Sequence, residues 1–281
     1  MSNLGIPKTY KLFIGGKFPR TESGRILKVR GPKGEFLANA SRASRKDFRN
    51  SVVAARRASG GWAKSTAYLK GQILYRIAEI LDGRTDRFVN ELVAHGLPEN
   101  KARAEVAEAV DLLVHYAGWS DKYQALFSTV NPVASSHFNF SSPEPSGVVV
   151  IVSPTRGSLP ELVSVIAPAM VGGNAVVVLA GENALTAISF AEVLATSDVP
   201  AGVVNILTGH RDELVPEFAK HMDVNAMLLC SDDAEERQGV ELEAVENLKR
   251  VALQPDRPLS PSPYHILDFQ EIKTTWHPVG V

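Results

Sequence analysis

The chain has 281 residues, of which 44% are hydrophobic and 22% are charged, and its formal net charge is -1. This length fits one large domain with an appendage or two modest domains, and the intermixed acidic and basic residues exclude the basic footprint of a nucleic-acid-binding protein. No apolar run is long enough to span a bilayer and residues 1–11 lack a signal-peptide pattern, so we expect a cytoplasmic protein that binds neither nucleic acid nor membranes.

Residues 1–126 are expected to form short strands followed by a block of helices. The strands fall within residues 8–40, where glycine and proline turns interrupt apolar runs. Ser44, with Asp47 three residues later, predicts a capping box that begins a helix, and Gly60–Gly61 is expected to end it. Apolar residues at helical spacing predict three more helices, over residues 66–82, 85–95 and 101–126.

Residues 127–146 and 147–253 differ in their apolar pattern. In the first segment, apolar and polar side chains alternate between prolines, which predicts a hairpin. In the second, four short apolar runs alternate with helical segments in a repeated βαβ rhythm. Such runs are buried on both faces of a parallel sheet, so we expect a doubly wound α/β unit that binds ligands at the carboxyl ends of its strands. The predicted strands are 148–152, 175–179, 203–207 and 226–229, and the predicted helices are 160–171, 184–196 and 211–221.

Residues 254–281 are expected to combine a linker with a strand. Four prolines lie between Gln254 and Pro263, which predicts the linker. The segment from Ile266 to Trp276 is the predicted terminal strand.

Three consecutive stretches resemble signature motifs of the aldehyde dehydrogenase superfamily, namely Pro145–Pro154, Ile166–Asn174 and Pro200–Gly209. Phe13–Lys17 is similar to the family's N-terminal strand, and Leu267–Thr274 to its C-terminal oligomerisation strand. The resemblance implies an α/β fold with a doubly wound parallel sheet, N-terminal helices, and a small oligomerisation hairpin and strand. It also implies that the large block with the nucleophilic cysteine is absent, as in the truncated second module of family-16 type aldehyde dehydrogenases.

The implied cofactor site departs from the family's pattern. Active members carry Pro-Trp-Asn after the first strand, where the asparagine amide stabilises an oxyanion, and this chain has Pro154, Thr155 and Arg156. The family's ribose clamp, a lysine and a glutamate, falls on Leu179 and Glu182. Its Gly-Ser pair after the fourth strand falls on Cys230 and Ser231, which are followed by Asp232 and Asp233.

These departures predict that no cofactor binds tightly. Leu179 has no donor for a ribose hydroxyl, and the two aspartates put negative charge where a pyrophosphate would bind. Pro154, Thr155, Glu182 and Ser231 are then remnants of a degenerate site with at most weak affinity for NAD(P). For Glu182 the favoured interpretation is a carboxylate that stabilises the start of a helix, near the positive end of the helix dipole.

Arg156 and Cys230, at the same implied site, are both expected to have no catalytic role. For Arg156 the favoured interpretation is a solvated loop residue or a partner contact. Cys230, the only cysteine, takes the place of a cofactor-loop glycine, so we expect a small, partly buried residue rather than a nucleophile. The seven histidines show no metal-ligand spacing. We therefore assign no catalytic residue and no metal site.

The resemblance implies that the hairpin and the last strand pair with the catalytic domain of a neighbouring subunit. The leading hypothesis is a non-catalytic subunit that scaffolds or regulates a catalytic aldehyde dehydrogenase, either as a separate partner or as a fused module; a homodimer through helices of the cofactor domain stays open. The alternatives are an NAD(P)-dependent aldehyde oxidoreductase component that uses a partner's cysteine, and a nucleotide-binding sensor. The predicted oligomerisation residues are Phe138, Phe140, Phe269, Ile272, Thr274 and Trp276.

Overall fold

Five strands form a parallel sheet in the middle of the computed structural model, which describes residues 8–257 and 260–280. Their order across the sheet is β10-β9-β6-β7-β8. Every residue of β6 to β9 is buried, as continuous apolar runs predict for a parallel sheet that is covered on both faces. The strands are β6 (Val148–Val152), β7 (Ala175–Leu179), β8 (Val204–Leu207), β9 (Ala226–Cys230) and β10 (Arg250–Gln254).

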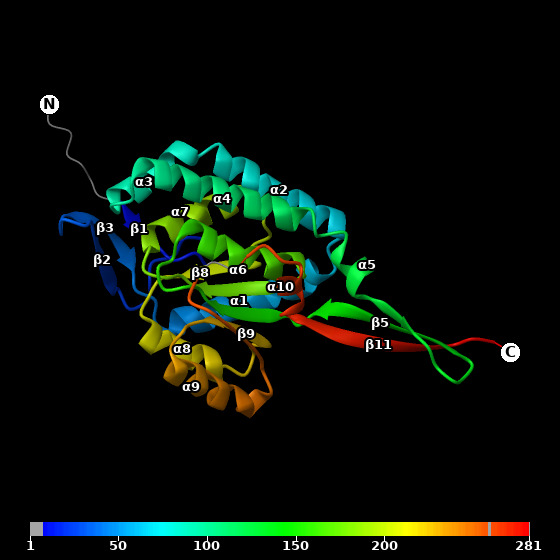
Figure 1. Cartoon of the computed structure of the whole chain (residues 1–281). Coiled ribbons are helices and arrows are strands. Elements are labelled where there is room, and N and C mark those ends of the chain that lie inside the picture. Colours follow the sequence, from blue (N-terminus) through cyan, green and yellow to red (C-terminus); the bar gives the residue numbers. More distant parts are fainter. Residues whose placement is uncertain (1–7, 258–259, 281) are drawn as a thin grey trace.

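Successive residues of each strand point to opposite faces of the sheet and enter two separate cores. In β6, Val149 and Ile151 join the core beneath one helical layer, whereas Val148 and Val150 join the core beneath the other. The first layer consists of α2 (Ala67–Asp82), α3 (Thr85–Ala94), α4 (Glu99–Ala117), α6 (Leu159–Val171) and α7 (Ala184–Leu194), and the second of α1 (Arg45–Ala63), α8 (Arg211–Lys220) and α9 (Ala234–Ala244), which is followed by a 3-10 turn over Val245–Asn247 (Figure 1). The doubly wound α/β fold is therefore confirmed.

Helix α1 confirms one prediction and contradicts another. It begins at the capping box of Ser44 and Asp47, but it runs through Gly60–Gly61 instead of ending there. Trp62 lies in the core, and its Nε1 donates a hydrogen bond to the carbonyl oxygen of Met170 at 3.0 Å. Burial of this large side chain outweighs the weak helix propensity of two glycines, about 1 kcal/mol each.

Two further boundaries differ from the sequence prediction. The helix expected over 101–126 is divided by a turn after Gly118, and its second part is α5 (Tyr123–Phe127), which the buried Tyr123 anchors. The sequence did not predict β10, which takes in only the first residue of the linker expected over residues 254–263, of which 258 and 259 lie outside the described residues. This strand pairs in parallel with β9, Arg250 opposite Ala226. Its apolar run is too short to stand out in the sequence.

An antiparallel arm projects from the body of the molecule (Figure 1). It contains β4 (Thr129–Asn131), β5 (His137–Pro145) and β11 (Gln270–Pro278) in the order β11-β5-β4. The predicted hairpin and terminal strand thus form one small sheet. The strand begins later than expected, because Ile266 is buried in the short helix α10 (Tyr264–Leu267).

A second small sheet lies at the opposite end of the molecule from the arm (Figure 1). Its strands are β1 (Thr9–Tyr10), β3 (Phe36–Ser41) and β2 (Ile26–Arg30), in that order. Phe13 connects this region to the main sheet through an isolated bridge to Ile206 of β8.

Candidate functional site

The carboxyl edge of the parallel sheet is the place where a doubly wound fold binds ligands. Strand β6 has β7 on one side and β9 on the other, so the chain changes direction at β6, and folds of this class place their ligand crevice at such a point, here between β6 and β9. All four predicted cofactor residues follow strands at this edge: Pro154 and Thr155 follow β6, Glu182 follows β7, and Ser231 follows β9.

A side chain of the protein itself occupies the crevice between β6 and β9. The guanidinium of Arg211, the first residue of α8, donates to the carbonyl oxygens of Ser153 at 3.0 Å and Cys230 at 2.9 Å. It also pairs with the carboxylate of Glu236 on α9 at 2.9 Å. Arg211 therefore connects α8 and α9 to the ends of two strands. The sequence predicts a role for neither Arg211 nor Glu236.

The edge is closed in the same way between β9 and β10. Arg237 donates to the carbonyl oxygens of Ser231 at 2.6 Å and Gln254 at 3.3 Å. Asp233 accepts hydrogen bonds from the first N–H groups of α9, and the hydroxyl of Ser231 accepts one from the N–H of Asp233. Two N–H donors at this helix start, those of Glu235 and Glu236, are thus engaged within the chain, whereas in other proteins such donors hold phosphates.

The loop after β6 is bound to neighbouring segments as well. The N–H of Thr155 donates to Asp256 at 2.6 Å, and its carbonyl oxygen accepts the N–H of Glu182 at 2.7 Å. Gly181 allows this approach, because a Cβ there would lie 2.4 Å from the carbonyl oxygen of Pro154. The two loops thus form one compact wall.

Beside that wall lies an open cleft of about 800 Å³. Arg156 reaches into it and forms an ion pair, 3.1 Å long, with Glu105 of α4, which is 7% exposed. Burial raises the pKa of Glu105, while the N–H of Leu159 and the guanidinium act in the opposite direction. Arg156 is therefore held by a buried carboxylate rather than simply solvated. The sequence signal for Glu105 is a carboxylate within the apolar stripe of its helix.

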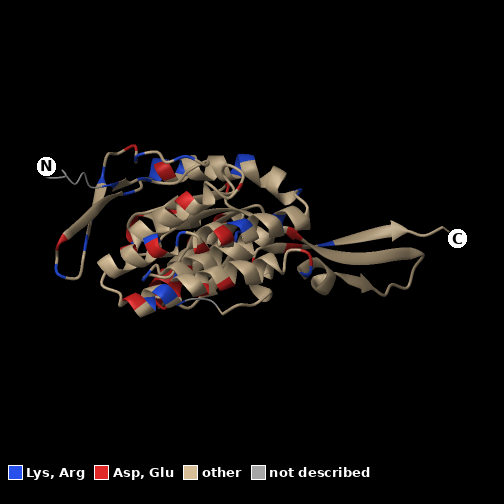
Figure 2. Cartoon of the chain, turned by 90° about the horizontal axis from the view of Figure 1, so that it is seen from above, with Lys and Arg blue, Asp and Glu red and all other residues tan. Residues whose placement is uncertain are grey.

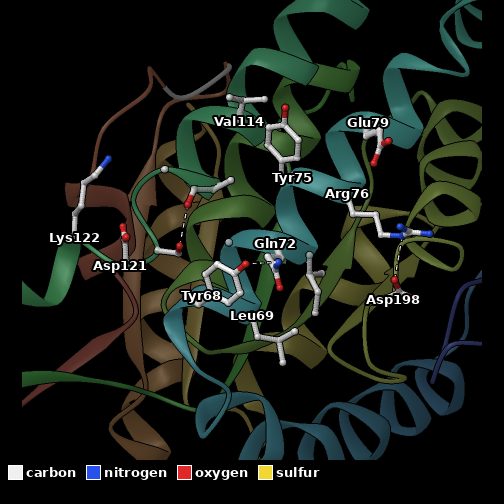
Figure 3. A pocket seen from close by; sticks show the side chains of 15 residues that line it. Tyr68, Leu69, Gln72, Tyr75, Arg76, Glu79, Val114, Asp121, Lys122 and Asp198 are labelled. Atoms are coloured by element: carbon white, nitrogen blue, oxygen red, sulfur yellow. Dashed lines mark hydrogen bonds and ion pairs between the residues drawn. The ribbon is translucent and has the colours of Figure 1, made fainter.

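A second hollow of about 770 Å³ lies on the outer surface, between α2 and the end of α4. Figure 3 shows Tyr68 and Tyr75 along α2, with Gln72 between them donating to the Tyr68 hydroxyl, and Arg76 paired with Asp198. None of the predicted cofactor or oligomerisation residues lines it.

Comparisons with known proteins decide the family. Residues 19–255 match the model of the aldehyde dehydrogenase family. The chain belongs to this family. It is 31% identical to a mitochondrial benzaldehyde dehydrogenase from Antirrhinum majus, over 87% of this chain and 46% of the relative. It is 30% identical to an alpha-ketoglutaric semialdehyde dehydrogenase from Bacillus subtilis (strain 168), over 81% of this chain and 47% of the relative.

Solved structures agree with this assignment. HpcC from Thermus thermophilus superimposes with a TM-score of 0.83 at 27% identity, over 88% of this chain and 48% of that one. The chain thus spans about half the length, or less, of the aldehyde dehydrogenase relatives that it matches.

Two residues that the resemblance places in the cofactor site lie in the core. Leu179 is 1% exposed and packs in the core beneath α1 and α8. Cys230 is fully buried, and burial raises the pKa of its thiol to about 12. A thiol with this pKa is protonated near neutral pH and is a poor nucleophile. Within residues 8–257 and 260–280, no group of three or more His, Cys, Asp or Glu side chains is placed to hold a metal ion.

The predicted oligomerisation residues separate into three places. The strand register puts Ile272, Thr274 and Trp276 on one face of the arm and Phe138 and Phe140 on the other. Ile272, Trp276 and Phe138 are about half exposed, and the two phenylalanine rings lie 5.6 Å apart.

Phe269 differs from the other five predicted oligomerisation residues. It is 1% exposed and packs in the core with Ile266, and its carbonyl oxygen accepts hydrogen bonds from Ser146 and Asn174. The prediction that Phe269 lies at an interface is therefore corrected: it lies inside the chain, where it anchors the base of the arm.

Along the part of the chain that the structure describes, no helix is both long and apolar enough to cross a membrane.

Proposed function

We propose that this chain is a non-catalytic member of the aldehyde dehydrogenase family that scaffolds or regulates a catalytic aldehyde dehydrogenase. The observation that carries the proposal is the direct connection from the cofactor domain to the arm. Only residues 255–269 separate β10 from β11. The family resemblance places the domain with the nucleophilic cysteine between these two strands.

The carboxyl edge of the sheet supports a loss of dinucleotide chemistry. The residues present do not fit NAD(P), because Leu179 offers no donor and Arg211 fills the crevice between β6 and β9. A phosphate would also meet the carboxylates of Glu236 and Asp233 near the start of α9. Cys230 cannot supply the nucleophile, since it is buried and its pKa is raised to about 12.

The arm supports an interaction with another chain. Strand β11 is a nine-residue edge strand, and among the described residues no strand pairs with its outer side. An unpaired edge is a ready template for another strand. Figure 2 shows acidic and basic residues intermixed over the body and few along the arm, which favours burial of the arm in an interface.

Affinity purification of the tagged chain from its own organism tests this function. The chain should retain a catalytic aldehyde dehydrogenase, identified by mass spectrometry. A double variant, Ile272→Asp with Trp276→Asp, should lose the partner because charges replace exposed apolar side chains on one arm face. Tyr68→Asp, in the hollow beside α2, should retain it as a matched control. Equal retention by the double variant would contradict the proposed role of the arm.

The open cleft beside Glu182 supports a second candidate, in which the chain binds a nucleotide as a sensor or as a half-site that uses a partner's cysteine. Calorimetric titration with NAD and NADP separates these functions. A scaffold gives no saturable heat with either nucleotide. A sensor binds one of them without a partner, and a half-site binds only in a complex that also oxidises aldehydes.

A further inference from the structure

The cleft beside Arg156 combines polar and apolar walls. Leu27 and Val29 of β2 and Leu97 after α3 are partly exposed and supply apolar surface, while Leu92 of α3 is buried at the cleft wall. Arg156 enters from the loop after β6, whereas Lys28 and Arg30 alternate with Leu27 and Val29 along β2 and are exposed at the rim. A cavity of this kind, apolar with a few polar groups at fixed positions, is typical of a small-molecule site.

Arg156 is held in place by a side chain that is itself buried. Nη2 of Arg156 contacts Oε2 of Glu105 at 3.1 Å, while Oε1 of Glu105 accepts the N–H of Leu159 at 3.0 Å. Both oxygens of the carboxylate are thus engaged, which fixes its orientation. In the part of the chain that the structure describes, the remaining nitrogens of Arg156 have no hydrogen-bond partner, and its side chain is 63% exposed. A guanidinium presents its free N–H groups in a planar fork that matches a carboxylate.

The charges of the walls distinguish one class of anion from another. Positive charge comes from Arg156 inside the cleft and from Lys28 and Arg30 at its rim, and Glu105, Glu182 and Asp212 carry negative charge. Arg211, which also lines the cleft, is neutralised by Glu236. Because these charges balance, a dianionic phosphate has no excess of cations to receive it, whereas a singly charged carboxylate needs one fork.

We propose that this cleft binds a small monocarboxylate with an apolar body. Its carboxylate pairs with the free edge of the Arg156 guanidinium, and its carbon chain lies against Leu97 and the apolar side chains of β2. Glu105 acts as a positioning residue, because it holds Arg156 without reaching the ligand. This site belongs to the chain itself and does not depend on the oligomer proposed above, so the two proposals fail separately.

Calorimetric titration of the full chain at constant ionic strength tests the site. The probes are the sodium salts of acetate, hexanoate and benzoate, with inorganic phosphate as the competing anion. Hexanoate or benzoate should bind saturably and more tightly than acetate, since only they reach the apolar wall. Phosphate should bind more weakly than either. Absence of saturable binding, or phosphate binding as tight as hexanoate binding, would overturn the proposal.

Variants test whether hexanoate binding depends on the Arg156 guanidinium. Arg156→Lys keeps the charge but removes the planar fork, and Arg156→Ala removes both, so each should weaken hexanoate binding about tenfold or more. Glu105→Gln should weaken it less, through a loosened Arg156. Arg57→Ala, which removes an exposed arginine outside the cleft, is the matched control and should bind as the natural chain does. Thermal unfolding of each variant confirms that it is folded, and unchanged affinity in Arg156→Ala would refute the site.

Discussion

Replacing Arg211 with methionine tests how the carboxyl edge of the sheet is closed. The substitution keeps a long side chain but removes hydrogen bonds to the carbonyl oxygens of Ser153 and Cys230 and the ion pair with Glu236. Hydrogen bonds to a charged group contribute about 1.5–3 kcal/mol each. The side chain of Arg211 is 22% exposed, so water replaces part of this loss. We expect the free energy of unfolding to fall by about 2–4 kcal/mol.

Urea unfolding followed by circular dichroism measures this loss, with an unchanged m-value as the sign of an intact two-state transition. Arg250→Met is the matched control, because Arg250 pairs with Glu271 at an exposed site. Its cost should stay below about 1 kcal/mol. The three groups that Arg211 leaves, the carbonyl oxygens of Ser153 and Cys230 and the carboxylate of Glu236, are all acceptors, so Arg211→Met should not gain affinity for NAD. A cost equal to that of the control, or tight NAD binding by the variant, would refute this reasoning.

Three further outcomes follow from the geometry. Gly181→Ala should destabilise the fold, because its Cβ would lie within 2.7 Å of three backbone atoms, whereas Gly239→Ala, with open space in α9, should stabilise it by about 0.5–1 kcal/mol in urea titrations. Burial lowers the pKa of Lys249 to about 8, against 10.5 for a free lysine, so this residue binds fewer protons in the folded chain between these values and its contribution to stability should rise with pH across that window. Cys230, whose pKa is raised, acts in the opposite direction above pH 9, so the measured quantity is the difference in unfolding free energy between the natural chain and Lys249→Met. In urea titrations this difference should shift in favour of the natural chain from pH 7 to pH 10. Cys230 should react with a thiol-specific dye only as fast as the chain unfolds, and rapid labelling of the native protein would contradict its burial.

Local patterns in the sequence predict most of the fold. The capping box at Ser44 depends on side chains three residues apart, and the buried strands depend on uninterrupted apolar runs, so neighbouring residues carry these signals. The prediction fails where distant contacts decide. Helix α1 continues through two glycines because the indole of Trp62 is hydrogen-bonded to Met170, more than 100 residues away in the sequence. β10 forms because it pairs with the edge of β9, and its own apolar run is too short to predict a strand.

The candidate site divides in the same way. The sequence places Thr155, Glu182 and Ser231 at the carboxyl edge of the sheet, because the order of strands and loops determines where they lie. It does not reveal Arg211 as the group that fills the crevice, since its partners follow β6, end β9 and lie on α9. Glu105 is hidden for a related reason, because only the packing of α4 against the loop after β6 brings it to Arg156.

Light scattering on a size-exclusion column tests the central claim most directly. The chain is co-expressed with the catalytic aldehyde dehydrogenases of its own organism, and the mass of each eluting species is measured. We predict a single species that contains both chains at a fixed ratio, and its loss when the arm carries the Ile272→Asp and Trp276→Asp substitutions. Elution of the unaltered chain alone, at its own mass or as a homo-oligomer in the presence of every such enzyme, would contradict the account.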